Sequence, residues 1–180
     1  VFPHLKKNQA VEALWEAILS TSRVTDDPIQ AWADHNADLE RRCAYLNSLN
    51  IASLHYRSAS GTDFHVGLIP ETEFKGGGET SLTGHFFNPN IPSEEVFISP
   101  RRGDAEGTVV ASMPLSYQGQ LSEDFSIRFE GGRAVEVHAA KNEALLKQMI
   151  SMDEGAAYLG ECALVPYDSP IRNTGILFYN

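Results

Sequence analysis

The sequence predicts an α+β fold, in which N-terminal helices precede a mixed, largely antiparallel β-sheet with short helices. Over the first fifty residues, apolar side chains recur three and four positions apart, as on one face of a helix. From about residue 51 onward they alternate with polar or small residues, as in half-buried strands. We therefore divide the chain into a helical segment, residues 1–50, which is the tail of a preceding domain or a linker, and a β-rich part, residues 51–180.

Two helices are expected in the first segment. The first covers about residues 8–21, and its apolar stripe consists of Val11, Leu14, Trp15 and Ile18. The second begins after Asp27, which can cap it, because Pro28 suits the first helical position. Its stripe runs to about Leu49 and consists of Ile29, Trp32, Asn36, Leu39, Cys43 and Leu46. We expect both tryptophans to anchor packing.

Strands are expected where the period changes to two. Residues 64–68 and 125–129 alternate in this way, and residues 108–111 are a further strand candidate. The pair Gly131-Gly132 separates the second of these strands from residues 134–137, which predicts a hairpin.

Two short helices and a last strand follow. Asn142 can cap one helix, and Ser151 with Glu154 three residues later forms a capping box for another, which should end near Gly160. A strand over residues 162–165 then completes the pattern.

Two glutamates are the candidate site residues. Glu95 and Glu161 each stand where a strand meets a turn or a helix, among residues typical of a core. A buried carboxylate must be paired, protonated or bound to a metal, because an isolated buried charge costs too much free energy. A metal site assembled from distant segments is one explanation. The other is that each glutamate caps a turn or pairs with an arginine such as Arg101 or Arg102.

Other polar residues favour structural interpretations. Glu94 should point away from Glu95 if both lie on a strand, so we expect it to face solvent or to hydrogen-bond a metal ligand. The run Gly76-Gly77-Gly78 lacks the Lys-Ser/Thr of a phosphate loop and is interpreted as a flexible turn. No spacing links the histidines, which we expect on the surface or hydrogen-bonded rather than as ligands: His55, His65, His85 and His138.

Composition limits the partners and the compartment. The 14 Lys and Arg residues against 24 Asp and Glu residues give a net charge of −10, so nucleic acid and anionic membrane are not expected as partners. There is no long apolar run and no signal-peptide pattern at the start. Cys43 and Cys162 are interpreted as small buried residues rather than a disulfide, which favours a cytoplasmic location.

Four motifs in order connect the chain to a known family. They are residues 90–100 with Asn-Ile-Pro-Ser-Glu-Glu-Val-Phe, residues 114–119 with 123–125, residues 153–161 with 163–166, and residues 169–170 with 177–180. On these motifs the chain resembles the thermophilic-type metallo-aminopeptidases, the group of aminopeptidase T, aminopeptidase S and PepS. The resemblance is strong over residues 88–180, fair over residues 51–87 and weaker before.

The resemblance implies a metal-dependent hydrolase. Family members release N-terminal amino acids from peptides with two divalent ions, and zinc, cobalt and manganese all stay open. The first two family ligands match Glu95 and Glu161, and Glu161 also has a possible catalytic role as proton acceptor. Their carboxyl groups should then lie about 3–8 Å apart. The resemblance further implies peptide substrates and a homodimeric parent enzyme.

The remaining family ligands follow the Leu-Phe-Tyr-Asn motif, which here ends at Asn180. We therefore expect an internal fragment, in which residues 51–180 form the β-rich part of the catalytic metal-binding domain. Two alternatives stay open: a non-catalytic dimerisation or interaction module, and a metal-free hydrolase that uses two carboxylates. Metal analysis after dialysis would distinguish the metal-free hydrolase from the metallo-aminopeptidase.

We predict that the 180-residue chain alone will not hydrolyse leucyl-p-nitroanilide at a useful rate, even with added cobalt. A hydrolytic metal centre needs three or four protein ligands, and only two match here. For the same reason the ions should be absent or weakly bound. Turnover close to that of an intact relative would contradict this, and adding the missing C-terminal segment should restore activity.

Overall fold

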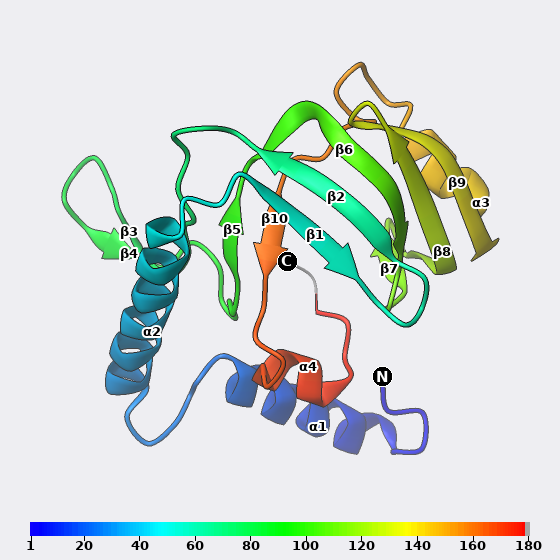
Figure 1. Cartoon of the computed structure of the whole chain (residues 1–180). Coiled ribbons are helices and arrows are strands. Elements are labelled where there is room, and N and C mark those ends of the chain that lie inside the picture. Colours follow the sequence, from blue (N-terminus) through cyan, green and yellow to red (C-terminus); the bar gives the residue numbers. More distant parts are fainter. Residues whose placement is uncertain (179–180) are drawn as a thin grey trace. The chain divides into compact units, whose positions relative to one another are not determined.

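The computed structural model describes residues 1–178 and confirms the α+β fold (Figure 1). The chain forms two compact units. The first consists of residues 1–49, residues 73–97 and the residues from Ala163 onward, and the second consists of residues 50–72 and 98–162. Each unit is thus assembled from segments that are distant in sequence.

The first unit contains three helices, α1 (Lys7–Thr21), α2 (Pro28–Ser48) and α4 (Pro170–Thr174). α1 and α4 lie side by side (Figure 1). The predicted cap of α2 is confirmed: the Asp27 carboxylate accepts a hydrogen bond of 3.0 Å from the backbone N–H of Gln30. This bond satisfies one of the donors that every helix start leaves without a backbone partner.

The predicted apolar stripes are only partly buried in the structure. Leu39 on α2 is 0% exposed, whereas Ile29 in the first turn of the same helix is 84% exposed. We expected Trp15 on α1 to anchor packing, but its side chain is 54% exposed in the part of the chain that the structure describes. This interpretation is therefore wrong. Periodicity located the helices correctly, but it did not show how far along each stripe other segments pack.

Short strands complete the first unit. β3 (Glu79–Thr80) pairs antiparallel with β4 (Phe86–Phe87). β5 (Val96–Ile98) forms a two-stranded sheet with β10 (Cys162–Leu164), which confirms the last predicted strand.

A larger antiparallel sheet dominates the second unit (Figure 1). Its strands follow the order β1-β2-β6-β8-β7, and β9 also pairs with β8. The bounds are Ser53–Arg57 for β1, Asp63–Leu68 for β2, Pro100–Val110 for β6, Leu115–Tyr117 for β7, Gln120–Glu130 for β8 and Arg133–Lys141 for β9. Helix α3 (Glu143–Met149) lies against β9 and β8.

One face of this sheet forms the core of the second unit. Phe64 and Val66 of β2 are buried on the same face, because residues two apart on a strand point the same way. The rings of Phe64 and Phe129 lie 5.2 Å apart, so β2 and β8 contribute to the same core. His65, which lies between Phe64 and Val66 on β2, points to the exposed face.

The hairpin predicted at Gly131-Gly132 is confirmed between β8 and β9. Both glycines have positive φ, of 55° and 79°. At Gly132 a β-carbon would come within 2.4 Å of the Cα of Gly103, so only glycine allows this close approach of two backbones.

The helix expected at residues 151–160 is wrong, since these residues form turns and bends. The Asp153 carboxylate accepts hydrogen bonds of 2.8 Å from the backbone N–H groups of Gly155 and Ala156, which stabilises a turn in place of a helix. Asn142 does precede α3, but its side chain donates to the carbonyl of Leu121 at 2.6 Å and makes no capping bond.

No helix in the part of the chain that the structure describes is both long enough and apolar enough to cross a lipid bilayer.

Replacing Leu39 by alanine should lower the free energy of unfolding by roughly 2–5 kcal/mol, because it removes a fully buried side chain and leaves a cavity. Ile29→Ala on the same helix is the matched control and should change it by less than about 0.5 kcal/mol, since Ile29 is mostly exposed. Urea denaturation of both variants measures the difference. Equal effects would show that the burial of α2 described above is wrong.

Candidate functional site

Each of the two predicted site glutamates directly precedes a short strand. Glu95 immediately precedes β5 and Glu161 immediately precedes β10, and β5 pairs with β10. Glu95 belongs to the first unit and Glu161 to the second. Their expected separation of about 3–8 Å within one dinuclear centre therefore stays a prediction.

The two glutamates differ in burial. Glu95 is half-buried, but Glu161 is exposed, so the expectation that both carboxylates are buried among core residues is wrong for Glu161. Because the residues before Glu161 form turns rather than a helix, it stands at a junction between a turn and a strand. The arginines that we considered as alternative partners pair with other carboxylates, Arg101 with Asp104 and Arg102 with Glu154.

Glu94 is the buried carboxylate of this region. It is 5% exposed and forms an ion pair with the guanidinium of Arg23. The expectation that Glu94 faces solvent or hydrogen-bonds a metal ligand is wrong on exposure. Burial alternates along residues 93–98, and Glu94 lies in the buried set with Val96 and Ile98, whereas Glu95 lies in the less buried set. An arginine from the connection between α1 and α2 supplies the counter-charge that burial requires.

A histidine and a tryptophan of α2 complete this buried group, which we call the Glu94 cluster: Arg23, Trp32, His35 and Glu94. His35 Nε2 donates to the carbonyl of Ser93 at 2.6 Å and lies 3.9 Å from a Glu94 carboxylate oxygen. The rings of Trp32 and His35 meet edge to face with centroids 5.5 Å apart. The cluster thus connects α2 to the residues directly before Glu95.

Trp32 also holds the connection between α1 and α2. Its indole N–H donates to the carbonyl of Ser22 at 2.9 Å, and the Arg23 guanidinium lies 5.9 Å from its ring centroid. Sequence reasoning missed this cluster. The available signal was the pair Trp32 and His35, three apart on one helix face.

The glycine run packs closely against the Glu95 backbone. A β-carbon at Gly76 would lie 2.7 Å from the carbonyl oxygen of Glu95 and 3.1 Å from Cγ1 of Val96. Lys75 and Phe97 exchange two backbone hydrogen bonds, of 2.9 and 2.8 Å. The run that we predicted as a flexible turn is therefore a packed support for Glu95, and glycine is needed there because the two backbones approach so closely.

A cavity of about 600 Å³ opens beside this support in the first unit. The residues that line it include three glutamates and one lysine: Glu40, Glu73, Glu79 and Lys75. The excess of negative charge favours a cationic ligand group over an anionic one.

The segment before Glu161 is attached to the sheet of the second unit. The backbone N–H of Ala134 on β9 donates to the carbonyl of Ala157 at 2.8 Å. The Arg102 guanidinium lies 4.4 Å from the ring centroid of Tyr158. Hydrogen bonds from Arg133, and secondarily from Arg102, lower the pKa of the Tyr158 phenol. These contacts fix the chain as far as Tyr158, which is three residues before Glu161.

Both cysteines are free thiols. Cys162 is buried and Cys43 is partly buried, so the prediction of small core residues without a disulfide agrees with the structure. Burial, and to a smaller extent the negative charge of Glu161, raises the pKa of the Cys162 thiol. A raised pKa makes a thiol less reactive, which fits a structural role.

Comparison with known proteins gives consistent matches. Residues 1–180 match the family model described as thermophilic metalloprotease (M29). The chain is 44% identical to aminopeptidase AmpS of Bacillus subtilis and 47% identical to aminopeptidase T of Thermus aquaticus, each over 181 residues. The solved structure of wild-type AmpT from Thermus thermophilus covers the whole chain with a TM-score of 0.91 at 46% identity.

All three matches cover 100% of this chain but 44% of the relative. The chain therefore spans less than half the length of the curated relatives that it matches. The predicted resemblance to the metallo-aminopeptidases is confirmed by these matches.

Replacing Arg23 by methionine should lower the free energy of unfolding by roughly 3–5 kcal/mol, because Glu94 then stays buried without its counter-charge. The double variant Arg23→Met with Glu94→Met should recover most of this loss, since no charge remains buried. Arg41→Met is the control: Arg41 pairs with Asp38 at the surface, so its removal should cost less than about 1 kcal/mol. Denaturant unfolding of the three variants provides the test, and a loss for Arg23→Met no larger than for Arg41→Met would contradict it.

Proposed function

The chain belongs to the thermophilic metalloprotease family (M29), and on that basis we propose that the protein containing it is a metal-dependent aminopeptidase that releases N-terminal amino acids from peptides. The observation that carries the proposal is the match along the whole chain to relatives named as aminopeptidases. Glu95 and Glu161 lie in two of the ordered sequence motifs on which the resemblance to this family rests, which supports a common role for these residues.

We propose Glu95 and Glu161 as ligands of two divalent metal ions. The donor set fits such ions, because carboxylate oxygens bind zinc, cobalt and manganese alike. Neither side chain is fully buried, so both carboxylates are accessible to an ion from solvent. Glu94 is different, since its charge is already neutralised by Arg23.

The two glutamates have separate tasks in the proposed reaction. When bound, divalent ions polarise a carbonyl group and lower the pKa of a coordinated water. Glu95 is held by its packed backbone and orients its carboxylate as a ligand. Glu161 is the proposed proton acceptor during attack of water on the peptide bond, in addition to its role as a ligand.

The Glu94 cluster and Gly76 hold the backbone around Glu95 at two points, Ser93 and Glu95 itself. His35 binds the carbonyl of Ser93, two residues before Glu95, while Gly76 packs against the carbonyl of Glu95 itself. A ligand needs such support, because small displacements of the ligating side chains weaken a metal site. The helical segment thus serves the proposed metal centre although it supplies no ligand to it.

The substrates proposed are peptides with a free N-terminus. The acidic lining of the cavity beside Gly76 complements the ammonium group that such a substrate carries. We also propose that the whole protein is a cytoplasmic homodimer and that neither nucleic acid nor membrane is a partner, in line with the net charge of −10.

In the whole protein, Glu95→Gln and Glu161→Gln should each lower kcat/KM for leucyl-p-nitroanilide by at least about 100-fold. Removing a metal ligand should cost at least as much as removing a residue that only orients one, which typically costs 10–100-fold. The content of bound metal after dialysis should fall in the same variants. Glu16→Gln, on the exposed surface of α1, is the control and should change neither quantity. Full metal content and activity in either site variant would exclude that residue from the proposed centre.

A further inference from the structure

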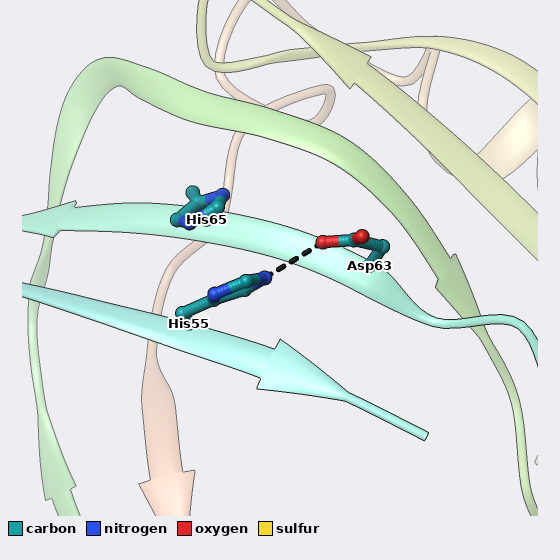
Figure 2. Close-up of side chains that lie close together, drawn as sticks. All are labelled: His55, Asp63 and His65. Atoms are coloured by element: carbon teal, nitrogen blue, oxygen red, sulfur yellow. Dashed lines mark hydrogen bonds and ion pairs between the residues drawn. The ribbon is translucent and has the colours of Figure 1, made fainter. Parts of the chain in front are cut away.

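Two histidines and an aspartate meet on the exposed face of the β1–β2 hairpin (Figure 2). His55 on β1 and His65 on β2 are directly opposite each other in the antiparallel register. Asp63 stands two residues before His65, so it shares the same face of the strand. One ligand atom from each of the three side chains lies within 4.8 Å of the others.

Contacts within this group bring the side chains together. His55 Nε2 lies 2.6 Å from one carboxylate oxygen of Asp63, and the imidazole rings of His55 and His65 stack with centroids 3.6 Å apart. The hydrogen bond with His55, and secondarily the charge of Arg57, lowers the pKa of the Asp63 carboxyl. An exposed aspartate is ionised at neutral pH, as a metal ligand must be.

We propose that His55, Asp63 and His65 form a binding site for a divalent transition-metal ion such as Zn²⁺. Two imidazole nitrogens and one carboxylate oxygen are a ligand set that zinc accepts, with the remaining position left to water or another molecule. Two atoms bound to one zinc ion are at most about 4 Å apart, because each bond measures roughly 2.0–2.2 Å. The three ligand atoms, all within 4.8 Å of one another, are close to these distances.

The neighbouring charges fit a cation at this position. Glu106 on β6 is opposite His65 in the register and so adds a negative charge to the same face of the sheet, where its carboxylate accepts a hydrogen bond of 2.6 Å from the backbone N–H of Gly131. Arg57 opposes this effect, but its guanidinium is nearest to the second carboxylate oxygen of Asp63, at 3.5 Å. The oxygen that contacts His55 is thus the one that takes part in the proposed site.

The position in the sheet suggests what a bound ion would do. β1 is the edge strand of the sheet, and among the described residues its strand partner is β2. A metal bridge between His55 and His65 would tie this edge to the next strand and slow its local opening. The proposal uses none of the residues assigned to the aminopeptidase centre and does not depend on that function.

Zinc titration calorimetry tests the site in the chain that carries Glu95→Gln and Glu161→Gln, so that the other proposed ligands do not contribute. We expect one zinc ion to bind. Adding His65→Ala should weaken the affinity at least about 10-fold, the lower end of losses known at metal sites. Adding His138→Ala, which removes an exposed histidine of β9 in the same sheet, should leave the affinity within about twofold.

Histidine ring resonances measured by NMR provide a second readout without any substitution at the site. Zinc should shift the ring signals of His55 and His65 and leave those of His138 in place. The proposal is overturned if zinc does not bind the Glu95→Gln, Glu161→Gln chain, if His65→Ala and His138→Ala weaken binding equally, or if the rings of His55 and His65 do not respond.

Discussion

The carboxylate of Glu94 lies buried beside the guanidinium of Arg23, and an unpaired charge at this depth would cost several kcal/mol. The pair therefore forces the connection between α1 and α2 to stay next to the residues that precede β5. His35 adds a hydrogen bond from α2 to the carbonyl of Ser93. Through these contacts, the position of the Glu95 backbone in the first unit depends on helices that are far from it in sequence.

A second constraint acts on the other side of Glu95. The backbones of Gly76 and Glu95 approach so closely that a β-carbon at Gly76 would lie 2.7 Å from the Glu95 carbonyl oxygen. The ion pair of Glu94 with Arg23 and the close approach of Gly76 thus restrict the same short segment, residues 93–95. The side chain of Glu95 stays half-buried while its backbone is held, which is the combination that a metal ligand needs.

The two proposed metal sites differ in chemistry. The ligands proposed for the aminopeptidase centre within this chain, Glu95 and Glu161, are carboxylates, which discriminate weakly between divalent ions, whereas the imidazoles of His55 and His65 favour zinc and later transition metals. The physical origin of each also differs: the first joins segments that precede paired strands, and the second follows from the register of a single hairpin.

The sequence by itself determined the elements whose apolar period is local, such as the two long helices and the hairpin at Gly131-Gly132, and its ordered motifs determined the family. It did not exclude the helix expected at residues 151–160, where the side chain of Asp153 takes the backbone donors. Only the tertiary structure decided that Glu94 pairs with Arg23 and that His55 faces His65. The reason is physical: period and capping act within a few residues, whereas burial of a charge and strand register depend on which distant segments pack together.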